Sequence, residues 1–130
     1  MKFSLEQTGL NQISFYDDSH IIISPEKQRY SLQLGASLIV TPDNVISDVK
    51  IADIMNLSDD NISYLQNLEP EIVIFTAGLT ATPRHPLSNT TLQLARKLNG
   101  IESMTLGAAC RTYNLLVLEG RRVILVISLT

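Results

Sequence analysis

The sequence has few of the residues that disulfide, metal or membrane chemistry requires. Only one of its 130 residues is a cysteine, Cys110, so no disulfide can form within the chain. The two histidines, His20 and His85, lie far apart and in no CxxC or HExxH pattern, so we expect neither a metal site nor a cofactor. No apolar run approaches the roughly 18 residues that cross a membrane. The first ten residues carry no signal-peptide core, so we expect a cytoplasmic protein without a membrane span.

Aromatic residues and basic runs are also scarce. Phenylalanine, tyrosine and tryptophan together make up 5% of the chain, and tryptophan is absent. Surfaces that bind nucleic acids combine basic patches with aromatic side chains on which bases stack. Because this chain has no basic run and few aromatic residues, we expect no nucleic-acid partner.

Charge is distributed unevenly along the chain. Residues 1–82 carry four Lys/Arg against eleven Asp/Glu, a net −7, whereas residues 83–130 carry six against two, a net +4. This polarity is typical of an acidic solvated face with a few basic helix ends. It is also compatible with self-association, or with an anionic ligand near the C-terminal half.

What the chain does contain is enough apolar sequence for a core. Hydrophobic residues make up 45% and charged residues 18%, which are ordinary values for a globular protein. A chain of this length corresponds to about one domain, and it can bury about two-thirds of its unfolded surface. No repeat, linker or low-complexity segment interrupts it. We therefore expect a single domain over residues 1–130.

The N-terminal part alternates in the way that short strands do. Ile13 and Phe15 alternate with polar neighbours, the turn-prone residues 17–19 follow, and residues 20–23 form a β-branched run. This order predicts a β-hairpin. Further strands and a turn are predicted at residues 30–34, 37–40 and 41–44.

From Ser58 onward, apolar runs alternate with segments of helical periodicity. Ser58 is a candidate N-cap for a helix that Pro70 stops, and the apolar run 72–75 predicts a central strand. Further elements are expected as a helix at 87–98, a strand at 101–105, a helix at 107–119 closed by Gly120, and a strand at 123–127. Such alternation builds an open α/β sheet.

Several segments of the chain resemble one family of small proteins. The most specific are residues 108–114, which include Arg-Thr-Tyr-Asn, and residues 119–122, which read Glu-Gly-Arg-Arg. Residues 100–105 support the same resemblance, and residues 71–78 and 37–40 do so more weakly. The family is one of unknown function that occurs in bacteria and archaea. Its eukaryotic members include a mitochondrial respiratory complex I assembly factor and an adipogenesis-associated domain protein.

This resemblance covers roughly residues 20–129 and implies a fold and a class of function. It implies a three-layer α/β fold with a mixed central sheet, helices packed on that sheet and an N-terminal hairpin region. It also implies a protein with no established enzymatic activity. The first functional hypothesis is accordingly a non-enzymatic protein that acts through protein–protein interaction.

The second hypothesis is a small-molecule or anion-binding module. In open α/β sheets, ligands bind beyond the carboxyl ends of the strands, where helix N-termini point. Arg84, His85 and Arg111 are placed to surround such a site. The alternative is that Arg84 is solvated and that Arg111 pairs with Glu102 or Glu119. The candidate ligand or partner cleft comprises Thr76, Gly78, Thr80, Arg84, His85, Gly107, Arg111, Tyr113 and Asn114.

Three residues of this segment have further alternatives. Cys110 lies in the first turn of a helix, where the dipole and Arg111 would lower a thiol pKa, but its small neighbours favour a buried, unreactive cysteine. Tyr113 and Asn114 project about 100° apart, so one is expected to pack inward with its polar tip hydrogen-bonded, and the other to hold a loop or to reach the cleft. For the Arg-Thr-Tyr-Asn segment as a whole, a structural role that ties the start of the helix to a neighbouring strand is at least as well supported as a ligand role.

A partner protein is expected, and so is a homodimer. If the strand at residues 20–23 lay at a sheet edge, its free backbone groups would invite pairing with a second chain. The homodimer is therefore predicted to form through the N-terminal strands.

Overall fold

The computed structural model describes residues 10–32, 37–49, 59–76 and 101–128. An antiparallel sheet at the N-terminal end contains β1 (Gln12–Tyr16), β2 (His20–Ser24) and β3 (Gln28–Ser31), in the order β1-β2-β3. The turn between β1 and β2 is held by Asp17, whose carboxylate accepts hydrogen bonds from the backbone N–H groups of Ser19 and His20. The predicted hairpin is confirmed.

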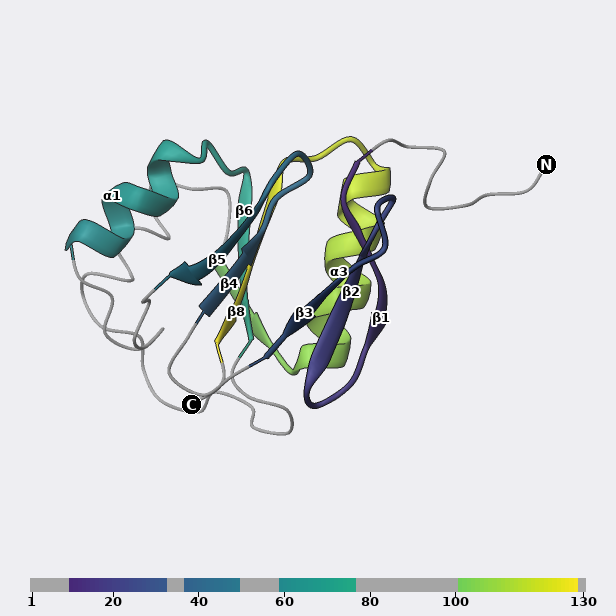
Figure 1. Cartoon of the computed structure of the whole chain (residues 1–130). Coiled ribbons are helices and arrows are strands. Elements are labelled where there is room, and N and C mark those ends of the chain that lie inside the picture. The colour runs from purple at the N-terminus through teal and green to yellow at the C-terminus, as the bar shows by residue number, and fades with distance from the viewer. Residues whose placement is uncertain (1–9, 33–36, 50–58, 77–100, 129–130) are drawn as a thin grey trace.

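A second, larger sheet forms the centre of the fold (Figure 1). Its strands are β4 (Ser37–Val40), β5 (Val45–Val49), β6 (Ile72–Thr76), β7 (Ile101–Met104) and β8 (Val123–Ser128), in the order β5-β4-β8-β6-β7. β4 runs antiparallel to β5 and β8, whereas β6 runs parallel to β8 and β7. The sheet is therefore mixed, as expected. β5 was not predicted, because polar residues interrupt its apolar pattern.

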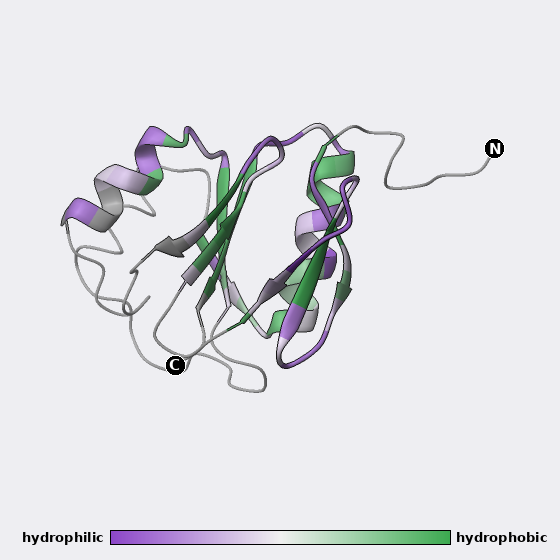
Figure 2. Cartoon of the chain, in the orientation of Figure 1, coloured by the Kyte–Doolittle hydropathy of each residue, from purple (hydrophilic) through white to green (hydrophobic). Residues whose placement is uncertain are grey.

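Both faces of the five-stranded sheet are covered, which gives three layers. On one face, Leu65 of α1 (Asp59–Asn67) packs with the side chains of Ile39, Phe75 and Val126. On the other face lie α3 (Leu106–Leu118) and the three-stranded sheet, as Figure 1 shows. The strands at the centre are strongly apolar (Figure 2) because both of their faces are buried.

A β-bulge in β1 changes which side chains face the core. Ile13 pairs with Ile23 in register, but beyond Ser14 the register shifts, so that Phe15 pairs with Ile22. Cross-strand partners share one face of a sheet, so the bulge turns Phe15 outward. Ile13 is 5% exposed and Phe15 is 46% exposed. The alternation of these two residues with polar neighbours is typical of a regular strand, and the bulge interrupts that regularity by placing them on opposite faces.

The strand that contains residues 20–23 is not an edge strand. β2 lies between β1 and β3 and is hydrogen-bonded to both. We predicted a dimer through this strand because it would have a free edge. Both of its edges are paired within the chain, so this reason for a dimer is wrong.

The ends of the C-terminal elements agree with the sequence prediction to within one or two residues. α3 ends at Leu118, and Gly120 follows with φ 80°, the left-handed conformation expected of a helix exit. The backbone N–H of Gly120 donates to the carbonyl of Val117. Ser58 and the predicted helix at 87–98 lie outside the described residues.

Candidate functional site

The carboxyl ends of β6 and β7 lie at one edge of the central sheet, as the candidate cleft required. The two strands are parallel, with Thr76 opposite Met104, and α3 begins two residues after β7. Thr76 is buried at this edge. Four candidate residues lie outside the described residues: Gly78, Thr80, Arg84 and His85. The convergence of Arg84, His85 and Arg111 therefore stays a prediction.

Arg111 is exposed on α3 and has a partner that the sequence did not indicate. Its Nη1 donates a hydrogen bond to the hydroxyl of Tyr16 over 3.1 Å. Among the described residues it forms no ion pair, so the expected pairing with Glu102 or Glu119 is not formed. The β1 bulge explains the difference, because it turns Tyr16 to the face of its sheet that meets α3.

Gly107 allows Tyr16 to lie against the first turn of α3. A Cβ at this position would stand 2.8 Å from the Tyr16 hydroxyl oxygen and 3.2 Å from Nη1 of Arg111. Any larger residue would have to displace the end of the tyrosine side chain. Tyr16 is thus a member of the site that sequence reasoning missed, and only the position of the bulge would have indicated it.

Tyr113 and Asn114 divide their roles as the helical geometry predicts. Tyr113 is fully buried, and its hydroxyl donates to the carbonyl of Asn11 over 3.0 Å. The side chain of Asn114 makes two hydrogen bonds to Ile13: its Nδ2 donates to the carbonyl (2.8 Å), and its Oδ1 accepts from the N–H (2.7 Å). At the outer edge of β1, the Asn114 side chain therefore makes the two hydrogen bonds to Ile13 that the backbone of a neighbouring strand would make. These contacts correspond to the structural alternative for the two residues, and a role of either residue in the cleft stays a prediction.

Cys110 is a buried thiol and lacks the properties of an activated nucleophile. It is 1% exposed, and burial raises the pKa of the Cys110 thiol to about 12, against a smaller lowering by Arg111. At neutral pH it is therefore protonated, and a thiol rather than a thiolate is a poor nucleophile. The alternative of a helix-activated cysteine is wrong.

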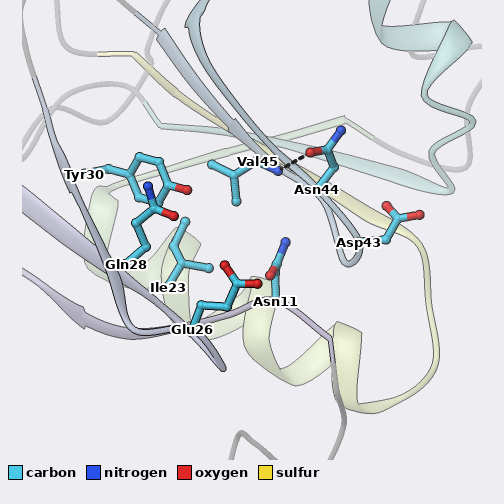
Figure 3. A pocket seen from close by; sticks show the side chains of 8 residues that line it. All are labelled: Asn11, Ile23, Glu26, Gln28, Tyr30, Asp43, Asn44 and Val45. Carbon is cyan, nitrogen blue, oxygen red and sulfur yellow. Dashed lines mark hydrogen bonds between the residues drawn. The ribbon is translucent and has the colours of Figure 1, made fainter.

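A cavity of about 220 Å³ lies between the two sheets (Figure 3). The β2–β3 hairpin forms one wall and the turn between β4 and β5 forms the other. The lining residues are Asn11, Ile23, Glu26, Gln28, Tyr30, Asp43, Asn44 and Val45. Asp43 is bound to Arg122, the residue before β8, so the cavity lies near the amino end of β8. The predicted cleft is at the opposite, carboxyl edge of the sheet.

The charged groups of this cavity are negative. Its described lining residues include the carboxylates of Glu26 and Asp43, the second of which pairs with Arg122, and none of these lining residues is basic. A hydrogen bond from the Thr41 hydroxyl, followed by one from Arg122, lowers the pKa of Asp43, so this group is ionised at neutral pH. Burial, followed by the charge of Glu26, raises the pKa of Tyr30, which keeps its hydroxyl protonated. Such a lining favours a cation over an anion.

The exposed side of α3 carries apolar side chains. Leu115 and Leu118 are 58% and 53% exposed. With Arg111 and Glu119, which are also exposed, they lie along one side of the helix because residues three or four positions apart are neighbours. We call these four residues the α3 stripe. The Tyr16–Arg111 hydrogen bond marks its N-terminal end.

Two further features are absent from the described residues, which are 10–32, 37–49, 59–76 and 101–128. In these ranges no three side chains of His, Cys, Asp or Glu are grouped in a way that could hold a metal ion. No helix in the described part of the chain has the length and apolar character needed to span a membrane.

Comparison with solved structures shows that the fold recurs in bacterial proteins. XCC1710 from Xanthomonas campestris is 25% identical, with a TM-score of 0.67 over 90% of this chain and 83% of that one. A Bartonella henselae protein described as an outer membrane protein is 18% identical, with a TM-score of 0.67 over 92% of this chain and 94% of that one. A Bordetella pertussis protein described as an Mth938-like domain is 22% identical, with a TM-score of 0.61 over 98% and 90% of the two chains.

Sequence comparison gives the family. No curated protein matches the chain. A family model described as "Protein of unknown function (DUF498/DUF598)" matches residues 13–128, which include both sheets and α3. This confirms that the sequence resembles a family of unknown function. The chain therefore belongs to the DUF498/DUF598 family.

Proposed function

We propose that this protein is a non-enzymatic interaction module that binds a protein surface through the α3 stripe. The observation that carries the proposal is the pair of leucines, Leu115 and Leu118, each more than half exposed on a helix whose other side is buried. Full burial of a leucine side chain contributes about 1.5–3 kcal/mol relative to full exposure, so each of these half-exposed leucines forgoes roughly half of that. A partner that covers both leucines recovers part of that free energy.

Arg111 supplies the polar contact of this surface. Arginine is enriched at the centres of protein interfaces, where its guanidinium makes several directed hydrogen bonds. One of the five N–H groups of Arg111 binds Tyr16, which holds the guanidinium near Gly107, at the N-terminal end of the stripe. The remaining donors are directed at a carboxylate or a carbonyl of the partner. An assembly-factor role, like that of the mitochondrial assembly factor in the family that the sequence resembles, uses such a surface.

The test is site-specific photo-crosslinking in cells that produce the protein at its native level. A photoreactive phenylalanine analogue replaces Leu115, and a matched variant carries it at Phe15, which is similarly exposed but lies on the outer face of the other sheet. We expect one discrete adduct from position 115, absent from position 15 and lost when Arg111→Glu is added. Equal adducts from both positions, or none from position 115, would overturn the proposal.

A second candidate function is the binding of a small cation in the cavity between the sheets. It is favoured by the carboxylate of Glu26, which Figure 3 shows beside the amide of Asn11. The volume of about 220 Å³ is smaller than most drug-sized sites, so an alkylammonium group is the expected ligand class. This changes the chemistry of the earlier small-molecule hypothesis from an anion to a cation.

Thermal unfolding with two ligands of the same chain length tests the second candidate. A ligand that binds only the native state raises the melting temperature. We expect butylammonium to raise it and butyrate not to, and we expect Glu26→Gln to remove the effect while Glu102→Gln, on an exposed position of β7, retains it. An equal shift with butyrate, or no shift with butylammonium, would exclude this function.

A further inference from the structure

We propose that the protein bound by the α3 stripe is a second copy of this chain, with the two α3 helices antiparallel about a twofold axis at Leu115. This inference rests on the proposed function, because it uses the same surface. A twofold interface requires a surface that is complementary to itself. The order of charges along the stripe meets that requirement.

Arg111 and Glu119 stand at equal distances on the two sides of Leu115. Each is four positions away, so in an antiparallel pair centred on Leu115 the Arg111 of one copy faces Glu119 of the partner subunit. The symmetry repeats this contact, which gives two ion pairs with the two Leu115 side chains between them. A parallel pairing in register would instead place like charges opposite each other, which is unfavourable.

The stripe has the shape that this pairing needs. At about 100° per residue, its four members fall within a sector of about 100°, the width of one contact face. Within one copy, Arg111 and Glu119 are separated by about 12 Å of helix, too far for a direct ion pair. No ion pair among the described residues uses either group, so both charges are available to the partner.

The helix dipole adds a reason for Glu119 to gain a partner. Glu119 follows the C-terminus of α3, where an anion opposes the dipole. In the antiparallel dimer, this unfavourable charge gains an opposite charge from the second copy. The contact is small, so we expect a weak, concentration-dependent dimer that weakens further with salt.

Substitutions that reverse the charges of Arg111 and Glu119 test this arrangement. The oligomeric state of the purified proteins is measured by sedimentation velocity. We expect the wild-type chain of 14.4 kDa to dimerise as its concentration rises, and both Arg111→Glu and Glu119→Arg to remain monomeric at that concentration. The double variant R111E/E119R should dimerise again. An equimolar mixture of the two single variants should form a heterodimer, because each carries two like charges that complement the other.

Two controls separate loss of contact from loss of fold. Leu115→Asp should be monomeric, whereas Phe15→Ser, a change of an exposed apolar residue elsewhere, should dimerise like wild type; all variants should melt as folded proteins. A wild-type chain that stays monomeric, or a mixture that forms no heterodimer, would overturn the second copy as partner. If the photoreactive analogue at position 115 still gives an adduct with another protein in cells, the proposed function stands and only the proposed dimer is wrong.

Discussion

At the scale of single residues, Cys110 shows how burial overrides a local electrostatic advantage. It lies in the first turns of a helix and precedes an arginine, two features that favour a thiolate. Yet the residue is 1% exposed, and the cost of desolvating a charge raises its pKa to about 12. A helix N-terminus therefore activates a cysteine only where solvent or a partner can reach the sulfur.

The raised pKa gives the first prediction. Below about pH 9 the thiol is protonated in both the native and the unfolded chain, so its ionisation does not change the free energy of unfolding. Above that pH the unfolded chain releases a proton that the native chain retains, so the free energy of unfolding falls by at most about 1.4 kcal/mol per pH unit. Denaturant unfolding at pH 8 and pH 10 should show a steeper loss for wild type than for Cys110→Ala.

Reactivity provides an independent check on the same residue. A disulfide reagent at pH 8 should modify Cys110 only after urea unfolds the chain. Rapid modification of the native protein would contradict the burial of the thiol.

Asn114 gives the second prediction. Its side chain holds both backbone groups of Ile13 at the outer edge of β1. Asn114→Ala leaves a donor and an acceptor without this partner, and we expect a loss of about 1.5–3 kcal/mol in the free energy of unfolding. Asn67→Ala, at an exposed position that ends α1, is the control and should change stability by less than about 0.5 kcal/mol. Equal effects of the two substitutions in urea unfolding would contradict the edge-holding role.

At the scale of elements, the start of α3 and the end of β1 form one unit. The hydroxyl of Tyr16 lies over Gly107 and accepts a hydrogen bond from Arg111. The bulge in β1 produces this contact, since without the register shift the outward and inward positions of the strand would be exchanged. The α3 stripe is therefore positioned by a strand that lies about a hundred residues earlier in the chain.

The third prediction concerns this unit. Gly107→Ala gains up to about 1 kcal/mol from the higher helix propensity of alanine but displaces the Tyr16 side chain. With Tyr16→Ala already present, the new methyl group meets only the flexible end of the Arg111 side chain, so the same substitution should be more stabilising. A double-mutant cycle measured by urea unfolding should give a coupling of about 1 kcal/mol. Additive effects would show that Tyr16 does not lie on the helix in solution.

At the scale of the whole molecule, Arg122 connects segments from three parts of the sequence. Its Nε donates to the carbonyl of Leu68, just after α1, over 2.8 Å. Its Nη1 is 3.1 Å from Asp43, in the turn between β4 and β5. Arg122 itself precedes β8, the central strand of the larger sheet. One side chain thus joins the α1 layer to two strands of the sheet and to the edge of the cavity.

The fourth prediction tests this connection. Arg122→Met keeps the apolar stem and removes both contacts, and we expect a loss of about 1–2 kcal/mol at pH 7, limited by the exposure of Asp43. Because the pKa of Asp43 is lowered, its share of stability is present above the ordinary value of 3.8 and is lost as pH falls through the folded pKa. Unfolding measured at pH 7 and pH 3 should therefore show a smaller difference between the variant and wild type at pH 3. A difference that grows in acid would contradict this assignment.

Much of the fold could be predicted from the sequence because its signals are local. The apolar runs of β6 and β8, the periodicity of α3 and the glycine that ends it each lie within a few residues of the element that they define. The split between Tyr113 and Asn114 follows from helical geometry alone. These features depend on the backbone and on neighbours in the chain, so the amino-acid order determines them directly.

The partners of the site residues were decided only by tertiary structure. Asn114 binds Ile13 and Arg111 binds Tyr16, contacts that span about a hundred residues of sequence. No local pattern indicated that a bulge at Ser14 would turn Phe15 outward and bring Tyr16 to the helix. Burial of Cys110 likewise depends on the sheet beneath α3 rather than on the residues beside it. The sequence therefore determined which elements form, whereas packing between sheets determined which side chains meet, because a side chain's partner depends on the register and layer of elements distant in the chain.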